Sequence, residues 1–285
     1  NMLEAQIQMA LDRLSNDEFD RLRVDPAWID EAAEAFKEAL QRQLIDRGKN
    51  DFRLRMSNVG RPLCQLQMAA NGADASRKPY NFKMMMMIGD AVECITDVIL
   101  KIAGANITGG KDQVELELAG TVIRGTDDIE IDDKVFDIKS CSPWAFDNKW
   151  AHGYEALKQD DPFGYVGQLT GYANAKGKEV GGWIVVNKST GGITVVEADA
   201  SENEKVMNLF NIQNNVEAVT KNHPFERNFE AEPDKWRGKP TGRKRLSRSC
   251  GWCDYVGSCW PTAKYEAHPD STAKSPPHYW FVGDE

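Results

Sequence analysis

The chain has 285 residues, of which 41% are hydrophobic and 28% are charged, and its formal net charge is −9. This composition is ordinary for a globular protein and leaves room for one large domain or for a core with appendages. No apolar run approaches the roughly 18–20 residues that cross a bilayer, and the N-terminus has no signal-peptide pattern. We therefore expect a cytoplasmic protein without a membrane partner. The acidic net charge does not exclude a nucleic-acid partner, because local basic patches carry phosphate contacts.

Helices are expected over the first part of the chain. Residues 3–47 carry alanine, leucine and charged side chains at helical spacing, and Asp25-Pro26 marks a break, because proline suits a first helical turn. Residues 84–103 are mainly apolar and contain Glu93, which predicts a buried helix with one acidic side chain. A buried unpaired glutamate is costly, so a metal or a lysine is its expected partner; the alternative is a charge at the helix margin.

Strands alternate with helices after this point. Residues 113–124 alternate apolar and polar side chains as a half-buried strand does, and 134–140 predict a second strand after the acidic, turn-rich stretch 127–133. The expected order then continues as helix, strand, strand and helix, at residues 164–175, 182–187, 192–197 and 200–220. This order predicts an α/β fold in which a mixed central sheet is flanked by helices.

An acidic stretch holds the most informative group of side chains. Residues two apart on a strand share a face, so Asp137 and Lys139 should point the same way, and a hairpin can bring Asp128 beside them. Repulsion between two carboxylates is relieved by a divalent cation, and Mg²⁺ prefers oxygen ligands and keeps waters. One such water can attack a phosphodiester while a lysine positions it. A solvated acidic hairpin is the alternative.

Four short motifs follow one another in the chain. They are Gly89-x-x-x-Glu93, Gly125-x-x-Asp128, Asp137-x-Lys139 and Gln168-x-x-x-Tyr172. This ordered set resembles the PD-(D/E)xK nuclease superfamily, in particular its RecB-like exonuclease branch. The resemblance implies a restriction-endonuclease-like core that hydrolyses phosphodiester bonds from DNA ends with Mg²⁺ or Mn²⁺. It divides the chain into an N-terminal helical region (1–60), the nuclease core (61–230) and a basic, cysteine-rich cap (231–285).

The resemblance also assigns roles to individual residues. It implies that Glu93, Asp128 and Asp137 ligate the metal, that the Ile138 carbonyl is a further ligand, and that Lys139 is the catalytic lysine.

Two further side chains and one neighbour complete the expected site. Gln168 and Tyr172 lie one helical turn apart and would orient the substrate strand or the lysine; a hydrogen-bonded edge of the core is the alternative. Asp127 is expected to point away from Asp128 if this segment is extended.

Cysteines form a second constellation. Cys250, Cys253 and Cys259 have the spacing C-x₂-C-x₅-C, and Cys64 is the candidate fourth ligand. One cysteine before the nuclease motifs and three after them resembles the iron–sulfur members of the superfamily. That resemblance implies a [4Fe–4S] cluster that joins the cap to Cys64. A Zn²⁺ site and unligated buried thiols are the alternatives.

Residues 235–248 carry no acidic side chain and predict a phosphate-binding surface, with a solvated linker as the alternative. The basic residues expected to contact DNA there are Arg237, Lys239, Arg243, Lys244, Arg245 and Arg248. Trp144 and Trp150 follow Lys139 and are expected to stack on unpaired bases, unless they pack beneath a surface loop.

Details around these motifs resemble exonucleases encoded by bacteriophages. This implies DNA, as a single strand or a duplex end, as the substrate, with degradation of host DNA or phage recombination as the role. The chain would then act in the host cytoplasm, with phage recombination proteins as partners. A structure-specific or restriction-type endonuclease is one alternative. A non-catalytic DNA-binding recombination partner is the other.

Overall fold

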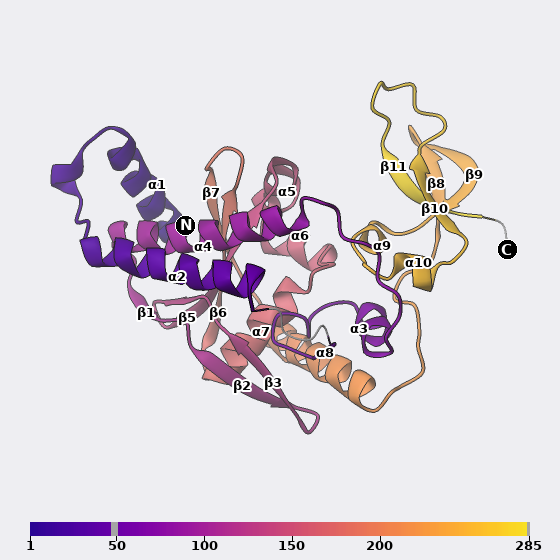
Figure 1. The fold of residues 1–285 in the computed structure, drawn as a ribbon, viewed down its shortest axis with the longest axis horizontal. Coiled ribbons are helices and arrows are strands. Elements are labelled where there is room, and N and C mark those ends of the chain that lie inside the picture. The colour runs from indigo at the N-terminus through magenta and orange to yellow at the C-terminus, as the bar shows by residue number, and fades with distance from the viewer. Residues whose placement is uncertain (47–50, 284–285) are drawn as a thin grey trace.

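A five-stranded mixed sheet lies at the centre of the molecule and carries helices on both faces (Figure 1). The computed structural model describes residues 1–46 and 51–283; Arg47 of the predicted helical segment and the last two residues of the predicted cap lie outside them. The strands, in sheet order, are β1 (Ile107–Gly109), β4 (Ile129–Ile131), β5 (Lys134–Cys141), β6 (Glu179–Asn187) and β7 (Ile193–Glu197). β5 and β6 are parallel and the other neighbours antiparallel. The predicted α/β fold with a mixed, helix-flanked sheet is confirmed.

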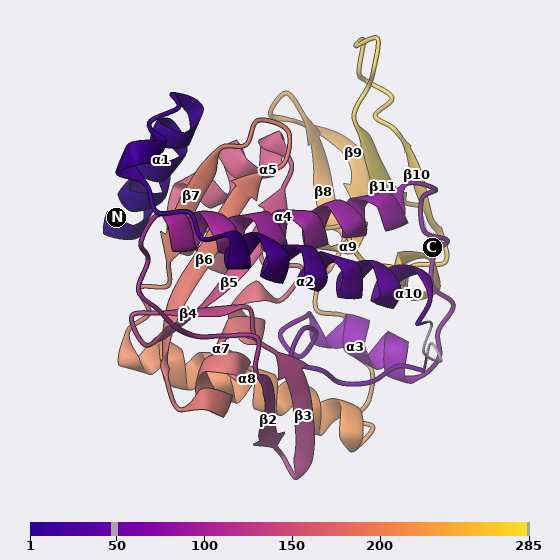
Figure 2. The same cartoon turned by 60° about the vertical axis from the view of Figure 1, so that its left-hand side comes forward.

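The predicted N-terminal helices are present and lie on one side of this sheet. They are α1 (Met2–Ser15), the short 3₁₀ helix η1 (Phe19–Arg21), α2 (Pro26–Leu44) and, later in the chain, α4 (Phe82–Ile102). Asp25 caps α2 by accepting a hydrogen bond from the Ala27 amide, and Pro26 occupies the first turn. Ile7 of α1 and Leu100 of α4 are buried in one apolar cluster with sheet residues. α2 lies along α4, as Figure 2 shows.

Three helices cover the opposite face. They are α6 (Gly153–Gln159), α7 (Tyr165–Lys176) and α8 (Glu202–Thr220). Leu169 of α7 and Ile212 of α8 share a buried cluster with Val135, Trp183 and Val185 of the sheet. The shorter helices are α3 (Leu63–Ala70), α5 (Pro143–Asn148) and the 3₁₀ helix η2 (Trp150–His152). No helix among the described residues combines the length and the apolar character that a membrane span requires.

Two predicted elements differ from the structure. Residues 113–124 do not form one strand but a hairpin of β2 (Gln113–Leu118) and β3 (Thr121–Thr126), because Ala119 and Gly120 turn the chain with φ angles of 47° and 75°. The turn-rich stretch before β5 contains β4, whose three residues are all buried. The helix predicted at 84–103 is confirmed as α4, but it is only partly buried, since Met84 is 58% exposed.

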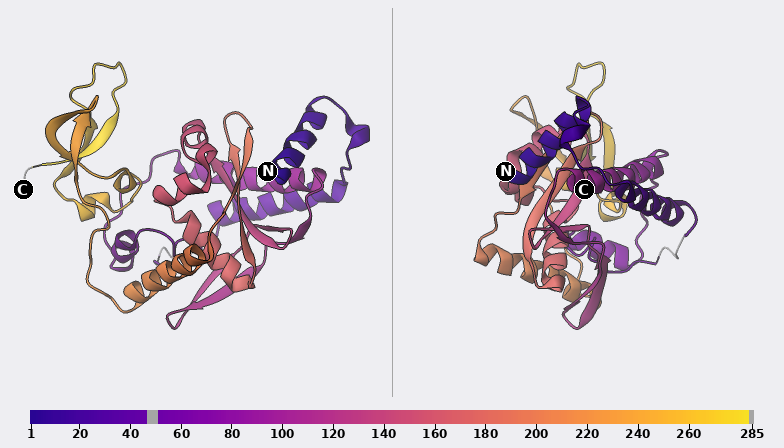
Figure 3. Two further views of the ribbon diagram at one scale, coloured as in Figure 1. Left: turned by 180° about the vertical axis from the view of Figure 1, so that it is seen from behind. Right: turned by 90° about the vertical axis from the view of Figure 1, so that its left-hand side faces the viewer.

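The C-terminal region forms a separate four-stranded antiparallel sheet beside the core (Figure 1; Figure 3, left). Its strands, in sheet order, are β10 (Ala263–Ala267), β11 (His278–Val282), β9 (Lys239–Arg245) and β8 (Glu232–Trp236). Two short helices, α9 (Arg248–Gly251) and α10 (Val256–Cys259), precede β10. Sequence patterns did not predict this sheet.

Candidate active site

Strand β5 carries the acid and the lysine of the predicted site. The ammonium nitrogen of Lys139 lies 3.0 Å from Oδ1 of Asp137 and 2.7 Å from its Oδ2. Both point away from the face on which Phe136 and Ile138 pack, as the alternation predicted. Burial lowers the pKa of Lys139, but the Asp137 and Asp128 carboxylates outweigh it. The pKa of Lys139 is therefore raised, and the side chain is held as an ammonium.

Asp128 lies beside this pair, at the entry to β4. Its Oδ2 accepts a hydrogen bond of 2.8 Å from the backbone amide of Ile138, so the β4–β5 hairpin closes the nine-residue spacing, as expected. Burial, and next the carboxylate of Asp137, raise the pKa of Asp128 to about 7. The buried Asp137 and the half-buried Asp128 are thus held close enough to oppose each other's ionisation.

Glu93 reaches the same place from helix α4. Burial raises its pKa, and the nearby Asp128 carboxylate raises it further. The ammonium group of Lys111 forms an ion pair with Glu93 and is also close enough to Asp128 to interact with it. Lys111 occupies the turn between β1 and β2 with a φ of 61°. It belongs to none of the four motifs, so sequence reasoning missed it.

Helix α7 supplies the remaining predicted side chains. The amide nitrogen of Gln168 donates a 3.3 Å hydrogen bond to Oδ1 of Asp137. Tyr172, one turn later, is 5% exposed, and its pKa is raised by burial and then by Asp128 and Asp137. A Cβ on Gly125 would lie 2.8 Å from the Tyr172 hydroxyl, so this glycine leaves room for the phenol. The structure therefore gathers the residues of all four motifs around Asp128 and Asp137.

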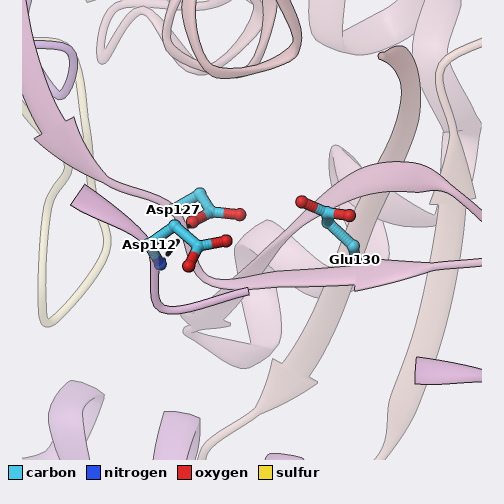
Figure 4. Close-up of side chains that lie close together, drawn as sticks. All are labelled: Asp112, Asp127 and Glu130. Carbon is cyan, nitrogen blue, oxygen red and sulfur yellow. Dashed lines mark hydrogen bonds between the residues drawn. The ribbon is translucent and has the colours of Figure 1, made fainter. Parts of the chain in front are cut away.

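A different acidic set has the tightest spacing among the described residues. Oxygens of Asp112, Asp127 and Glu130 lie within 4.8 Å of one another (Figure 4). Lys176 lies among them, with its ammonium nitrogen 2.7 Å from Asp112 and 2.8 Å from Asp127 and paired with Glu130 as well. A lysine already neutralises these carboxylates, so we interpret the set as a structural ion-pair cluster. The expected orientation of Asp127, away from Asp128, is confirmed.

The donor set around Asp128 and Asp137 nevertheless fits a hard divalent cation. It offers three carboxylates and the Ile138 carbonyl, which are the oxygen ligands that Mg²⁺ prefers. Oδ2 of Asp137 is fully buried and accepts no hydrogen bond from residues 1–46 and 51–283, although Lys139 is near. In this structure Lys111 is paired with Glu93, and Lys139 is paired with Asp137. The carboxylate oxygens of Glu93, Asp128 and Asp137 do not all lie within 4.8 Å of one another.

Two hollows in the surface meet at this site. The larger, of about 1740 Å³, is lined by residues of α2, the 51–61 segment, α4, β5 and α7. It includes Lys139 and Gln168, whereas the second, of about 980 Å³, includes Asp128 and Tyr172. Glu93 lines both. A polymer lying along the two hollows would pass Glu93, Asp128 and Lys139.

The four predicted cluster cysteines lie in one region, although Cys64 precedes the central sheet in the chain and the other three follow it. Burial raises the pKa of the Cys250 thiol to about 12, and the neighbouring sulfurs of Cys64, Cys259 and Cys253 add to the shift. Burial and then Cys64 and Cys259 likewise raise the pKa of Cys253 to about 11. No three cysteine sulfurs of the described chain lie within 4.8 Å of one another. Tetrahedral zinc with bonds of about 2.3 Å would hold its sulfurs roughly 3.8 Å apart, so this spacing is wider than a zinc site needs.

The tryptophans predicted to contact DNA have different surroundings. Trp150 is 3% exposed and packs against Trp183 and Tyr165, with ring centroids 6.2 and 5.5 Å apart. Its burial contradicts the expectation that it stacks on bases. Trp144 is 50% exposed, and the Arg248 guanidinium lies 3.9 Å from its ring centroid.

The basic residues predicted to contact DNA are likewise divided. Arg243 pairs with Asp270 at 2.6 Å, and Arg245 lies 3.5 Å from the buried Asp234. These two arginines therefore have internal partners. Exposed side chains at the remaining positions of the predicted surface are Arg237, Lys239, Lys244 and Arg248.

Comparisons with known proteins add little to this geometry. No protein-family model matches the chain, and no curated protein matches it. Among solved structures, the chain is similar to that in the crystal structure of SSO0001, with 14% sequence identity and a TM-score of 0.42. The similarity covers 80% of this chain and 94% of the other. At this level the likeness carries no conclusion about function.

Proposed function

We propose that the chain is a metal-dependent DNA exonuclease with a restriction-endonuclease-like PD-(D/E)xK core. The observation that carries this proposal is the gathering of Asp128, Asp137 and Lys139 at the point where two hollows meet. Unlike the Lys176 cluster, this group holds two carboxylates that oppose each other's ionisation beside a cleft, since burial and then Asp137 raise the pKa of Asp128 to about 7. Such pairs are typical of functional sites. A charged polymer with a hydrolysable phosphodiester matches both the cleft and the chemistry.

Each side chain then has a defined task. Glu93, Asp128, Asp137 and the Ile138 carbonyl would hold Mg²⁺ or Mn²⁺, which supplies an activated water and neutralises phosphate charge when bound. Lys139 donates hydrogen bonds to the attacking water and to the phosphate oxygens, where negative charge develops.

The residues of α7 act around this group. Gln168 keeps Asp137 in place through its hydrogen bond and is a positioning residue. Tyr172 stays a neutral phenol, because burial and two carboxylates raise its pKa, and it can donate a hydrogen bond to the strand.

The cysteines support a second part of the proposal. Cys64, Cys250, Cys253 and Cys259 would hold a [4Fe–4S] cluster, whose chemistry here is structural. Cys64, which precedes the central sheet, lies close enough to Cys250 and Cys253 of the cap for its thiol to raise their pKa values further after burial. Such a cluster would fix the C-terminal cap against the core.

Hydrolysis of an end-labelled oligodeoxynucleotide with Mg²⁺ or Mn²⁺ tests the function. We expect Lys139→Gln and Asp137→Asn each to lower the rate by at least about 10²-fold, since Lys139 stabilises charge that develops in the transition state and Asp137 holds the cation. Lys134→Gln, an exposed lysine on the same strand, is the matched control and should be unchanged. Cleavage that survives in Lys139→Gln would reject the proposed site.

A further inference from the structure

The segment that leads from α2 to α3 forms one wall of the larger hollow. Arg53, Arg55 and Arg61 of this segment all line it. Residues 53–61 contain no acidic side chain, and the site residues Glu93 and Lys139 line the same hollow. These arginines lie outside the basic stretch 235–248 and were not among the predicted DNA contacts.

These arginines lack the internal partners that other arginines have. None of the three forms an ion pair within residues 1–46 and 51–283, whereas Arg243 and Arg245 of the cap both pair with aspartates. The Nε of Arg61 is fully buried and has no hydrogen-bond partner among the described residues. A buried donor without a partner is costly, and a guanidinium matches the geometry of a phosphate group. The arrangement therefore fits an anionic ligand.

The backbone holds this wall in one position. Met56 and Val59 are 0% exposed, and the Met56 amide donates a 2.9 Å hydrogen bond to the Arg124 carbonyl. The side-chain amide of Asn215 donates to the carbonyls of Val59 and Arg61 at 2.7 and 3.1 Å. The arginines are therefore presented from an ordered segment, which lowers the entropic cost of binding a ligand.

A close backbone contact also holds this segment against helix α7. A Cβ on Gly60 would lie 2.4 Å from the carbonyl oxygen of Gly164 and 2.7 Å from the Cα of Gly167. Only glycine allows this approach, so the segment sits directly on the N-terminal end of α7. The arginines thus stand at a fixed distance from Gln168 and the carboxylates.

The hollow is also lined by acidic residues (Asp46, Asp51 and Asp90), by the lysines Lys83 and Lys188, and by a set of aromatic and methionine side chains. The aromatic and methionine side chains are Phe52, Phe82, Met85, Met86, Phe163 and Tyr165. Grooves for unpaired strands combine cationic side chains, which follow the phosphates, with aromatic faces on which bases stack. A duplex keeps its bases stacked inside and cannot use such faces.

We infer that Arg53, Arg55 and Arg61 bind successive phosphates of a single DNA strand whose unpaired bases contact the aromatic side of the hollow. The strand leads to Asp128, Asp137 and Lys139. This inference rests on the proposed function and names its substrate as single-stranded DNA. It also moves the main phosphate contacts from the cap to the core.

Binding of a fluorescein-labelled dT₂₀ oligonucleotide in EDTA, followed by anisotropy, tests this inference without catalysis. We expect Arg55→Gln and Arg61→Gln each to weaken binding about five- to tenfold and to reduce the slope of log affinity against log salt by roughly 0.7–1. Arg61→Lys keeps the charge but not the guanidinium donors, and it should lose less affinity than Arg61→Gln. Lys37→Gln, on the outer side of α2, and Lys244→Gln, in the cap, are matched controls and should bind as the wild type does.

Two outcomes would overturn the inference. One is unchanged dT₂₀ binding in both glutamine variants; the other is tighter arginine-dependent binding of a blunt duplex of the same length. If Arg61→Gln unfolds early, the exposed Arg55 carries the test alone. Arginine-dependent dT₂₀ binding by a protein that cleaves no DNA would reject the proposed function and leave this inference standing. Cleavage of DNA by a protein whose dT₂₀ binding does not depend on the arginines would reject this inference and leave the proposed function standing.

Discussion

Two lysines form ion pairs with carboxylates of the site. Lys139 pairs with Asp137, and Lys111 pairs with Glu93, while Asp128 is held by a backbone amide. The motifs predicted four of these five residues, because they place the carboxylates and Lys139 at spacings that a helix and a hairpin bring together. Lys111 was not predictable in this way, since its position depends on how the β1–β2 turn folds back over α4.

The pH dependence of stability tests the environment of Asp128. Because its pKa is raised to about 7 in the folded state, the folded protein keeps a proton that the unfolded chain releases above about pH 4. The free energy of unfolding therefore falls as pH rises from about 4 to 7. We expect Asp128→Asn in EDTA to raise the melting temperature by roughly 2–4 °C or more at pH 8, and not at pH 4.

Asp127→Asn is the matched control for this measurement. Its carboxylate is paired with Lys176, so neutralising it should lower the melting temperature at pH 8. Equal effects of the two substitutions would contradict the account of Asp128. Circular dichroism melts at several pH values are sufficient to separate them.

Lys111 should compete with the catalytic cation. Its positive charge lies beside Glu93 and Asp128, and a unit charge about 4 Å away contributes about 1 kcal/mol even in water. We expect Lys111→Met to tighten Mn²⁺ binding about fivefold or more, as measured by calorimetric titration, with Lys37→Met unchanged. Weaker Mn²⁺ binding in Lys111→Met would mean that this lysine supports the site instead.

Helix α7 joins the active site to the structural ion-pair cluster at its other end. Gln168 and Tyr172 face Asp137, and Lys176 neutralises Asp127 and Glu130. The helix itself was predictable from its composition, and so was the pair of residues one turn apart. The ion pairs of Lys176 were not predictable, because the acidic stretch that contains Asp127 and Glu130 is typical of a solvated turn. In the structure these two side chains are only 1% and 2% exposed.

Removing Lys176 should destabilise the fold without touching the carboxylates that bind the catalytic cation. Lys176→Met leaves Asp127 and Glu130 buried with too little positive charge, and breaking a buried ion pair costs about 3–5 kcal/mol. Urea unfolding measures this loss, and the exposed Lys134→Met serves as its control. A loss under about 1 kcal/mol would show that the cluster is weakly coupled to the fold.

Irregular elements account for most of the failures of sequence-based prediction. The β2–β3 hairpin was read as one strand because Val114, Leu116 and Leu118 continue their alternation into Val122 across the turn. The cap sheet was missed because β9, for example, is made almost entirely of basic and small residues. Its stability depends on tertiary contacts such as the pairing of the buried Asp234 with His268 at 3.1 Å.

At the scale of the whole molecule, the cap is attached to the loop between α3 and α4. The amide of Ser76 donates a 2.7 Å hydrogen bond to the Asp254 carbonyl, and the Ser258 hydroxyl donates to the Asp74 carbonyl at the same distance. Lys78 pairs with Asp254 at 2.5 Å. The cap also contacts the core through Arg248 over the Trp144 ring and Trp252 against Phe163, and the proposed cluster would add to this attachment.

Cys64→Ser tests this arrangement. We expect the variant to lose most of its iron and acid-labile sulfide after anaerobic purification, and limited proteolysis to cut more quickly between α8 and β8. Cys94 is not one of the four proposed ligands, so Cys94→Ser should keep its iron and its acid-labile sulfide. A colourless wild-type protein with stoichiometric zinc would contradict the proposed cluster.

The most direct test of the central claim is digestion of end-labelled linear DNA and covalently closed circular DNA, each single- and double-stranded, with Mg²⁺ or Mn²⁺. The account predicts that wild-type protein degrades linear DNA, prefers the single strand and leaves circles intact, and that Lys139→Ala is inactive on all four. Cutting of circles would make the enzyme an endonuclease on the same site. Absence of any cleavage with either metal, or full activity of Lys139→Ala, would contradict the claim that this site is a nuclease centre.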